Sequence, residues 1–134
     1  MRLILDCNIL ISAGWNPGVG RQAFFEAIEK HQIFISPGII QEYLRVIHYP
    51  KFRHIAPLLE MYCAKLIYVA NLVHTVPCPY QLPDPSDEVY LATALAAGAS
   101  VIITGNMKHY PDPSYGAVQI LTPREFLALT NQTS

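Results

Sequence analysis

Short apolar runs of strand length alternate along the chain with longer segments in which apolar residues recur at helical spacing. Helical spacing is found over residues 21–30, 37–47, 57–70, 87–97 and 122–129, after a first helical turn that begins at residue 9. The apolar runs cover residues 2–5, 32–35, 101–104 and 117–121, with a weaker candidate at 71–76. Continuous apolar runs are typical of strands that helices cover on both faces. The pattern therefore predicts an α/β fold, a three-layer α/β/α sandwich with a central parallel sheet and helices on both faces.

Capping residues mark where several of these helices begin and end. Ser36 followed by a proline is typical of a helix N-terminus, and Gly98 suits the position after a helix. Thr122 with Glu125 three residues later forms the capping-box pattern at the start of the last helix. The proline-rich segment 77–86 is predicted to be a loop, because proline continues neither a helix nor a central strand.

The composition narrows the class of protein. The chain is predicted to form a single domain over residues 1–134, and with 51% hydrophobic and 14% charged residues it is not disordered. A net charge of −1 argues against a broadly basic nucleic-acid binder, so contact with phosphates must come from a local cluster or a bound metal. The apolar excess leaves room for a surface that binds a protein partner.

Cysteine usage and hydropathy indicate where the protein acts. The three cysteines form an odd, unpatterned set without a Cys-x-x-Cys motif, which argues for a reducing compartment and against disulfides or structural zinc. Asp6 and Asn8 interrupt the N-terminal apolar run before it reaches the length of a secretory signal. The most apolar stretch, 58–73, contains charged residues and is not expected to span a membrane. We therefore expect a cytoplasmic protein with no membrane association.

Polar residues gather at one predicted edge of the sheet. Asp6 stands directly after the first apolar run, where open α/β sheets contact their ligands, although it could instead only cap the next segment. In a parallel sheet, residues just past a strand and residues near a helix N-terminus share an edge. Glu42 lies early in the helix after the second strand, Asp87 opens a helix, and Asn106 follows a later strand. The convergence of all four residues favours the ligand-contacting interpretation of Asp6.

Three carboxylates in one small site predict a bound cation. Two charges about 5 Å apart repel by roughly 3 kcal/mol at an effective dielectric constant of about 20, and a cation between them removes that cost. An all-oxygen set without a paired histidine or cysteine suits Mg²⁺ or Mn²⁺ rather than zinc. Such a metal binds a phosphate oxygen and lowers the pKa of a bound water, so the site predicts phosphate-ester chemistry.

In this order, the motifs resemble the PIN domain family over essentially the whole chain. They are Asp6-Cys7-Asn8-Ile9-Leu10-Ile11-Ser12, Glu42, Asp87-Glu88-Val89-Tyr90-Leu91-Ala92-Thr93-Ala94 and Ile102-Ile103-Thr104-Gly105-Asn106. The chain most resembles the small single-domain PIN proteins that include VapC-type toxins of toxin–antitoxin pairs. The resemblance implies a Mg²⁺- or Mn²⁺-dependent ribonuclease in which Asp6, Glu42 and Asp87 match the acidic positions that bind metal. Asn106 matches a fourth catalytic position at which many members carry Asp, so the site holds one negative charge fewer.

Four further residues are predicted to support the site. Ser12 matches a small hydroxyl position near the site of the family, and Thr104 is expected to act through its hydroxyl. Asn8 is expected to support the loop that it begins. Asp84 competes with Asp87 for the acidic position of the family, but the spacing of Asp87 to the apolar face of its helix fits the helix start better.

Basic residues offer contacts for RNA at two places. Lys108 and His109, just beyond Asn106, are placed to meet a phosphate of the substrate. Lys51 and Arg53 belong to a basic and aromatic cluster that could hold RNA phosphates and stack bases, the alternative being an ordinary solvated helix end.

Two functions of different classes remain open at this stage. The first is an endoribonuclease that hydrolyses RNA by a metal-activated water, as the toxin of a toxin–antitoxin pair. The alternative is a catalytically weak or inactive PIN-like module that binds RNA or protein. The helix over residues 57–70 is apolar on more than one side, so it lies deep in the core or forms an interface with an antitoxin or a second copy of the chain.

Overall fold

Every predicted apolar run forms a strand in the computed structural model, which describes residues 1–133 and the side chains of residues 1–131. The strands are β1 (Arg2–Leu5), β2 (Gln32–Ile35), β3 (Asn71–Leu72), β4 (Val101–Ile103), β5 (Ser114–Tyr115) and β6 (Val118–Leu121). The strand expected over residues 71–76 is shorter than predicted. The backbone N–H of Val73 still donates to the carbonyl of Ile35 on β2, and beyond it the chain is exposed and enters the proline-rich loop.

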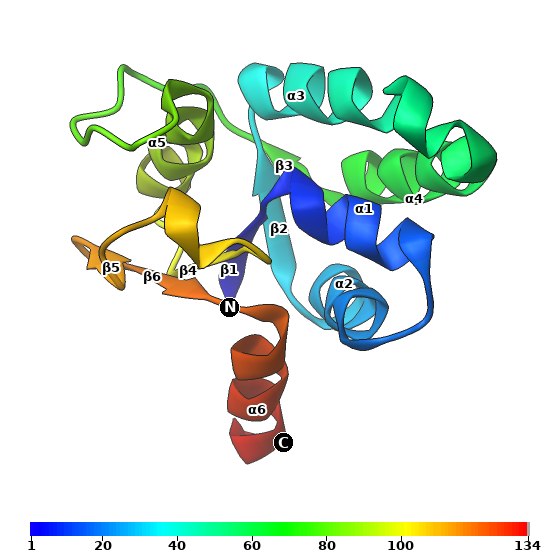
Figure 1. The fold of residues 1–134 in the computed structure, drawn as a ribbon. Helices are drawn as coiled ribbons and strands as arrows, with labels where there is room; N and C mark the ends of the chain where they lie inside the picture. Colours follow the sequence, from blue (N-terminus) through cyan, green and yellow to red (C-terminus); the bar gives the residue numbers. More distant parts are fainter. Residues whose placement is uncertain (134) are drawn as a thin grey trace.

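Six α-helices alternate with the strands (Figure 1). They are α1 (Cys7–Trp15), α2 (Val19–Lys30), α3 (Pro37–Ile47), α4 (Ala56–Val69), α5 (Glu88–Ala97) and α6 (Pro123–Thr133). Three short 3₁₀ helices join them, η1 (Pro50–Ile55), η2 (Pro85–Asp87) and η3 (Met107–His109). The first helix extends the single predicted turn as far as Trp15, and η1 replaces the solvated helix end that was one interpretation of the basic cluster.

The predicted caps are present. The hydroxyl of Ser36 accepts a hydrogen bond from the backbone N–H of Ile39 at the start of α3. Thr122 and Glu125 form reciprocal hydrogen bonds between side chain and backbone at the start of α6. Gly98 ends α5 with a φ of 63°, in the left-handed region that favours glycine. Asp87 differs from expectation in one detail: it ends η2 and is the N-cap of α5, which begins at Glu88.

The six strands form one sheet in the order β3-β2-β1-β4-β6-β5. All neighbouring pairs are parallel except β5 and β6, which are antiparallel. The central parallel sheet is therefore confirmed, and the antiparallel edge strand β5 is an element that was not predicted from the sequence. The two-residue strand β5 contributes one buried side chain, Tyr115, and returns to β6 through Gly116 at a φ of 61°. A strand this short has no apolar run by which the sequence could reveal it.

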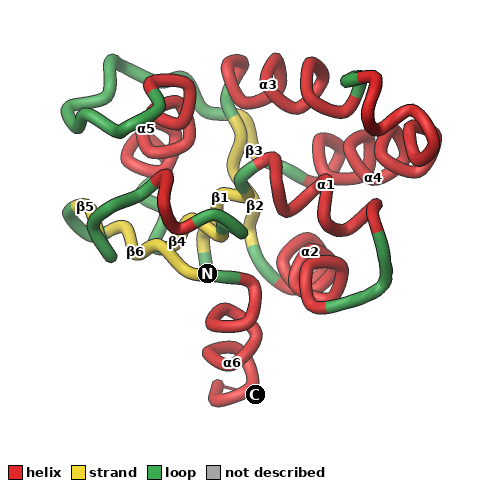
Figure 2. The backbone as a smooth tube through the Cα atoms, viewed as in Figure 1, coloured by secondary structure: helices red, strands yellow, loops and turns green. Residues whose placement is uncertain are grey.

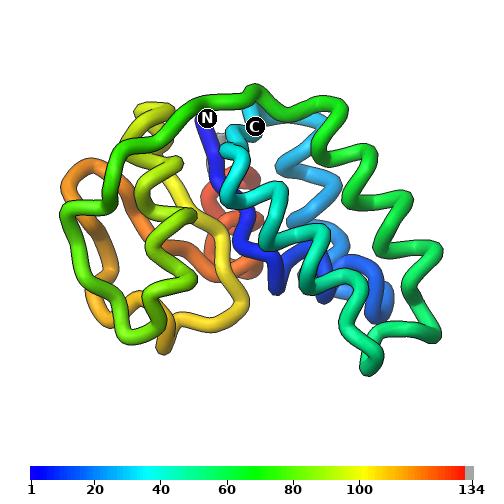
Figure 3. The backbone as a smooth tube through the Cα atoms, turned by 90° about the horizontal axis from the view of Figure 1, so that it is seen from above, coloured from blue at the N-terminus to red at the C-terminus, as the bar shows by residue number. Residues whose placement is uncertain are grey.

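Helices cover both faces of the sheet, which confirms the three-layer architecture. Helix α5 packs over β1, β2 and β4, while α2 contacts β2 and α6 contacts β6 on the opposite side (Figure 1). Helices α3 and α4 lie side by side and run in opposite directions, as the view from above shows (Figure 3). The loop between β3 and η2 leads the chain from α4 to the side of the molecule occupied by α5 (Figure 2). In the described part of the chain, no helix has the length and apolar character needed to cross a membrane.

The central strand β1 fixes the backbone on which the candidate site is built. Leu3, Ile4 and Leu5 are fully buried, and β1 pairs with β2 on one side and with β4 on the other. Above it, α3 and α5 approach closely: a Cβ on Gly38 would lie 2.6 Å from the Cγ2 atom of Val89. A side chain at residue 38 would therefore separate the two helices that carry Glu42 and Asp87.

Candidate metal centre

The candidate site lies at the point where the order of the strands reverses. From β1 the chain moves outward to β2 and β3, then returns to β4 on the other side of β1. In open α/β sheets, ligands bind beyond the carboxyl ends of the strands at this position. Asp6 directly follows β1, and its backbone N–H donates to the carbonyl of Ile103 at the end of β4 over 3.0 Å. The residues that follow both strands are therefore held next to one another.

Two buried tyrosines hold the backbone on either side of Asp6. The hydroxyl of Tyr43, on α3, donates to the carbonyl of Leu5. The hydroxyl of Tyr90, on α5, accepts a hydrogen bond of 3.3 Å from the backbone N–H of Cys7. Both rings are almost fully buried, so the position of Asp6 is fixed by packing as well as by the sheet. No role in the site was predicted for either tyrosine, because a tyrosine at a buried helical position does not reveal which backbone group its hydroxyl contacts.

Three side chains from separate segments form a compact cluster, defined here as the Asp6–Asp87–His109 cluster. Each offers a ligand atom, and these atoms all lie within 4.8 Å of one another. Asp6 is 2% exposed and Asp87 is 6% exposed, so two carboxylates share a nearly buried space. Oδ2 of Asp87 lies 3.1 Å from Nδ1 of His109. Two of the three members were predicted to bind a metal, whereas His109 was predicted only to contact RNA.

A single hydroxyl links Asp6 to the loop after β4. Thr104 is fully buried, and its hydroxyl donates to Oδ2 of Asp6 at 3.0 Å. Oγ1 of Thr104 also accepts two hydrogen bonds, from Nδ2 of Asn8 at 3.2 Å and from the backbone N–H of Asn106 at 3.1 Å. One donated and two accepted hydrogen bonds use the full capacity of a hydroxyl group. This geometry is that of the supporting role predicted for Thr104.

Asn8 and Asn106 organise the loop from β4 to η3. Oδ1 of Asn8 accepts a hydrogen bond of 2.8 Å from the backbone N–H of Gly105, which ties this loop to the start of α1. Asn106 caps η3, because its Oδ1 accepts from the backbone N–H of Lys108. Nδ2 of Asn106 lies 3.0 Å from Nε2 of His109. Asn106 therefore contacts the imidazole of the cluster.

Burial disfavours the charged form of both carboxylates. Burial raises the pKa of Asp6, and the hydrogen bond from Thr104 lowers it in part. Burial, followed by repulsion from Asp6, raises the pKa of Asp87 to about 6, while His109 lowers it. Burial also raises the pKa of the Cys7 thiol to about 12, so Cys7 stays protonated beside the site. A cation between the two carboxylates would favour their charged forms.

The donor set fits a divalent metal. Oδ2 of Asp87 and Nδ1 of His109 are both buried and contact each other, and neither atom has a further hydrogen-bond partner among the described residues. A buried polar atom without a partner is costly, and a cation placed between such atoms removes the cost. A hard divalent ion is bound by carboxylate oxygens, and imidazole nitrogen is a ligand for transition-metal ions.

Glu42 is not brought into the cluster. It lies on α3 with 17% of its side chain exposed, and its carboxylate forms an ion pair with Arg45 one turn further along the helix. Its charge nonetheless contributes to the raised pKa of Asp87, after burial and Asp6. Glu42 thus lies near the Asp6–Asp87–His109 cluster without joining it.

The remaining predicted residues lie around the cluster or apart from it. Asp84 is exposed and caps η2 through Ser86, which lowers the pKa of Asp84. Ser12 packs against α2: a Cβ on Gly20 would lie 2.1 Å from its hydroxyl oxygen. Lys108 is exposed beside His109 on η3. The basic residues Lys51 and Arg53 are exposed on η1, beyond the end of α3, and do not belong to the cluster.

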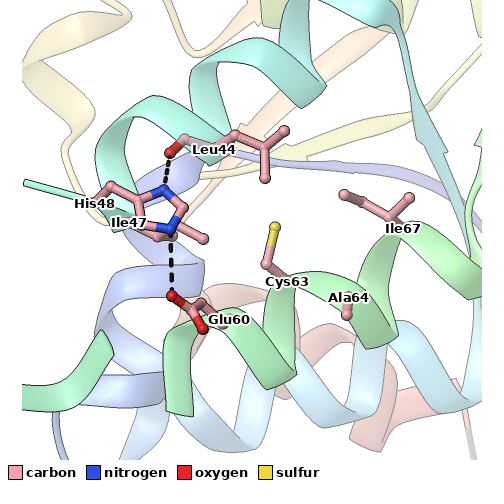
Figure 4. Close-up of a pocket in the computed structure, with 7 residues that line it drawn as sticks. All are labelled: Leu44, Ile47, His48, Glu60, Cys63, Ala64 and Ile67. Atoms are coloured by element: carbon pink, nitrogen blue, oxygen red, sulfur yellow. Dashed lines mark hydrogen bonds and ion pairs between the residues drawn. The ribbon is translucent and has the colours of Figure 1, made fainter. Parts of the chain in front are cut away.

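An apolar groove lies between α3 and α4, on a different part of α3 from its N-terminus. It has a volume of about 290 Å³ and is lined by Leu44, Ile47, His48, Glu60, Cys63, Ala64 and Ile67 (Figure 4). The contact between His48 and Glu60, at 3.3 Å, bridges the two helices. Helix α4 buries one face in the core and exposes apolar side chains on the other, with Met61 58% and Tyr68 89% exposed. The buried face agrees with the interpretation that this helix lies in the core, and the use of the exposed face as an interface stays a prediction.

Taken together, the doubly wound sheet and its acidic edge define an α/β domain with a candidate metal centre at the switch point. Residues 2–108 match the family model of the PIN domain, and the chain belongs to the PIN domain family. Membership implies nuclease chemistry in general terms. No curated protein matches the sequence.

A solved structure shares the fold. The chain is similar to a chain in the crystal structure of VapBC2 from Rickettsia felis bound to a DNA fragment from their promoter, with a TM-score of 0.63 and 14% sequence identity. The similarity covers 91% of this chain and 98% of that chain. The resemblance to the PIN domain family is thereby confirmed at the level of sequence family and of fold.

Proposed function

We propose that this protein is a metal-dependent endoribonuclease that acts in the cytoplasm. The observation that carries the proposal is the Asp6–Asp87–His109 cluster, in which two buried carboxylates from separate segments meet at the switch point and Oδ2 of Asp87 contacts the imidazole of His109. Membership of the PIN domain family supports the assignment to nuclease chemistry. The three cysteines are free thiols, which is consistent with a reducing compartment.

Each residue of the site has a proposed role. Asp6 and Asp87 would hold Mg²⁺ or Mn²⁺, which when bound supplies a water of lowered pKa and positive charge against the phosphate. Thr104 keeps Asp6 in the orientation required for binding, through its hydrogen bond to Oδ2. Lys108 is exposed beside the cluster and can meet a neighbouring phosphate of the RNA.

Glu42 and Asn106 complete the proposed site at a greater distance from the metal. Glu42 is proposed to lie at the border of the site, where its charge adds to the raised pKa of Asp87 after burial, Asp6 and Asp84. Its ion pair with Arg45 would have to open, or a water would have to intervene, for Glu42 to reach the metal. Asn106 is proposed to act through His109, whose Nε2 it contacts.

We also propose that the protein is the toxin of a toxin–antitoxin pair and that the antitoxin binds in the groove between α3 and α4. The structurally similar chain comes from a complex named VapBC2. The groove offers an apolar floor between two helices with further apolar surface at Met61 and Leu44, as expected for a site that receives an apolar segment of a partner. Association of two copies of the chain through this surface is the alternative outcome of an experiment on binding.

The ribonuclease proposal is tested by incubating the purified protein with RNA in Mg²⁺, in Mn²⁺ and in EDTA. Cleavage is expected with either metal and not in EDTA. Asp6→Asn and Asp87→Asn, which preserve side-chain shape, should each reduce cleavage at least about a hundredfold. Glu29→Gln, on the exposed side of α2, is a matched control that should cleave at the wild-type rate. Equal cleavage by the wild-type protein and both aspartate variants would contradict the proposal.

A further inference from the structure

We propose that His109 binds the metal directly through Nδ1, with Asn106 orienting its ring, so that the site prefers a transition-metal ion such as Mn²⁺ to Mg²⁺. This inference rests on the proposed metal-dependent function and concerns the ligand set of that site. An acidic site alone would bind through oxygen atoms. In the structure the third member of the cluster is the imidazole of His109, on η3, and not the expected carboxylate of Glu42, on α3.

The separation between ligand atoms supports direct binding. Two ligands in neighbouring positions of an octahedral ion, each about 2.1 Å from the metal, lie about 3 Å apart. Oδ2 of Asp87 and Nδ1 of His109 are buried and lie 3.1 Å apart, and beyond this contact with each other neither atom has a hydrogen-bond partner among the described residues. All three ligand atoms of the cluster lie within 4.8 Å of one another, close to the separation of about 4.2 Å between opposite ligands of such an ion, so binding to all three requires only a small movement of the side chains.

Asn106 provides the second contact that a metal-binding histidine requires. A histidine bound to metal through one ring nitrogen generally donates the N–H of the other nitrogen to an oxygen, which fixes the orientation of the ring. Nε2 of His109 faces the side-chain amide of Asn106 at 3.0 Å. In the structure Nδ2 of Asn106 faces Nε2, and turning the amide by 180° would present Oδ1 to an Nε2–H group at the cost of the hydrogen bond that Oδ1 accepts from the backbone N–H of Lys108. Asn106, on η3 with His109, is therefore a positioning residue for the imidazole.

The nitrogen ligand determines which ion is preferred. Mg²⁺ favours oxygen ligands and retains much of its water, whereas imidazole binds first-row transition-metal ions more readily. The protein should bind Mn²⁺ at least about tenfold more tightly than Mg²⁺, and loss of the imidazole should remove most of this preference. The affinity for Mg²⁺ should change much less than the affinity for Mn²⁺.

Electron spin-echo envelope modulation of the Mn²⁺-loaded protein tests the ligand directly, because nitrogen bound to Mn²⁺ modulates the echo. The wild-type protein should show ¹⁴N modulation, and labelling of histidine with ¹⁵N should alter it. His109→Gln should abolish the modulation. His74→Gln, which changes an exposed histidine in the loop after β3, should retain it. Wild-type protein that binds Mn²⁺ without nitrogen modulation would overturn the inference, and this measurement does not depend on the folding of any variant.

Ribonuclease assays on the same samples separate this inference from the proposed function. Nitrogen modulation without RNA cleavage would leave the assignment of His109 standing and would overturn the ribonuclease proposal. RNA cleavage in Mn²⁺ without nitrogen modulation would support the ribonuclease proposal and would overturn the assignment of His109 as a metal ligand.

Discussion

The hydroxyl of Thr104 donates a hydrogen bond to Oδ2 of Asp6 across the ends of two neighbouring strands, and both side chains are almost completely buried. This contact connects the first acidic residue of the chain to the loop that carries Asn106 and His109. The orientation of Asp6 therefore depends on a residue 98 positions later in the sequence.

Removal of this hydroxyl should weaken metal binding. Thr104→Val preserves the shape of the side chain but leaves Asp6, Nδ2 of Asn8 and the N–H of Asn106 without their shared partner. We expect metal affinity to fall on the order of 10- to 100-fold and the free energy of unfolding to fall by about 1–3 kcal/mol. Isothermal titration calorimetry and thermal denaturation measure the two effects. Thr104→Ser retains the hydroxyl and should behave nearly as the wild-type protein, so a Val variant with wild-type metal affinity would refute the supporting role.

The charge on Asp87 should make the metal-free protein less stable at neutral pH. Its pKa rises from 3.8 to about 6 on folding, chiefly through burial. Between about pH 4 and 6 the folded carboxyl thus holds a proton that the unfolded chain has released, so the contribution of this group to stability falls as the pH rises through that range. Asp87→Asn removes the charge and should raise the free energy of unfolding in EDTA at pH 7.5 by about 1–3 kcal/mol.

Thermal denaturation of wild type and Asp87→Asn at pH 4.5 and pH 7.5 in EDTA measures this effect. The advantage of the variant should be small at the lower pH and large at the higher. Addition of Mn²⁺ should stabilise the wild-type protein and leave the variant nearly unchanged. A variant that is less stable than wild type at pH 7.5 in EDTA would show that the carboxylate is stabilised by contacts other than a metal.

Two substitutions of Asn106 should separate two effects of this residue. One is its contact with the imidazole of His109, and the other is the absence of the negative charge that an aspartate would supply. Asn106→Asp retains an oxygen that can accept from Nε2 of His109 and adds a charge near the metal, so Mn²⁺ affinity should rise. Asn106→Leu has a similar shape but offers no hydrogen bond, and Mn²⁺ affinity should fall about tenfold or more. Equal affinities for the Leu variant and wild type would exclude the positioning role. Mn²⁺ titration of each variant measures the affinity, and circular dichroism shows whether both variants are folded.

A bulky charge in the groove between α3 and α4 should block the proposed partner. Ala64 is exposed on α4 and lines the groove, so Ala64→Arg fills the space without disturbing the core. Binding to a candidate antitoxin encoded beside this protein should weaken about a hundredfold or more. Ala96→Arg, at an exposed position of α5, is the matched control. Unchanged antitoxin binding by Ala64→Arg would place the interface elsewhere, and a change in oligomeric state alone would identify the groove as a contact between two copies of the chain.

The elements that the sequence predicted are those whose signals are local. A few neighbouring residues are enough to recognise apolar runs such as 2–5 and 32–35 and caps such as Ser36 and Thr122. The strand β5 leaves no such mark, because two residues with one buried side chain form no pattern. Its antiparallel pairing is a consequence of the turn at Gly116 and not of any apolar period.

The candidate site likewise contains some residues that the sequence could predict and others that it could not. Asp6 and Asp87 could be predicted to meet, because residues after a parallel strand and at a helix N-terminus share one edge of the sheet. The place of His109 depends on how η3 turns after β4, which apolar periodicity does not describe. The spacing of Asn106 and His109, three residues apart after a strand, is the signal from which one helical turn and a shared contact could have been inferred. The ion pair that holds Glu42 away from the cluster likewise follows from Arg45 one turn further along the helix.

The most direct test of the central claim is RNA cleavage measured as a function of metal occupancy. The purified protein is titrated with Mn²⁺, and metal binding and the rate of RNA cleavage are recorded on the same samples. The account predicts that the rate follows occupancy of one site and that Asp6→Asn loses both binding and cleavage. Cleavage that persists in Asp6→Asn, or that does not follow metal occupancy in the wild-type protein, would contradict it.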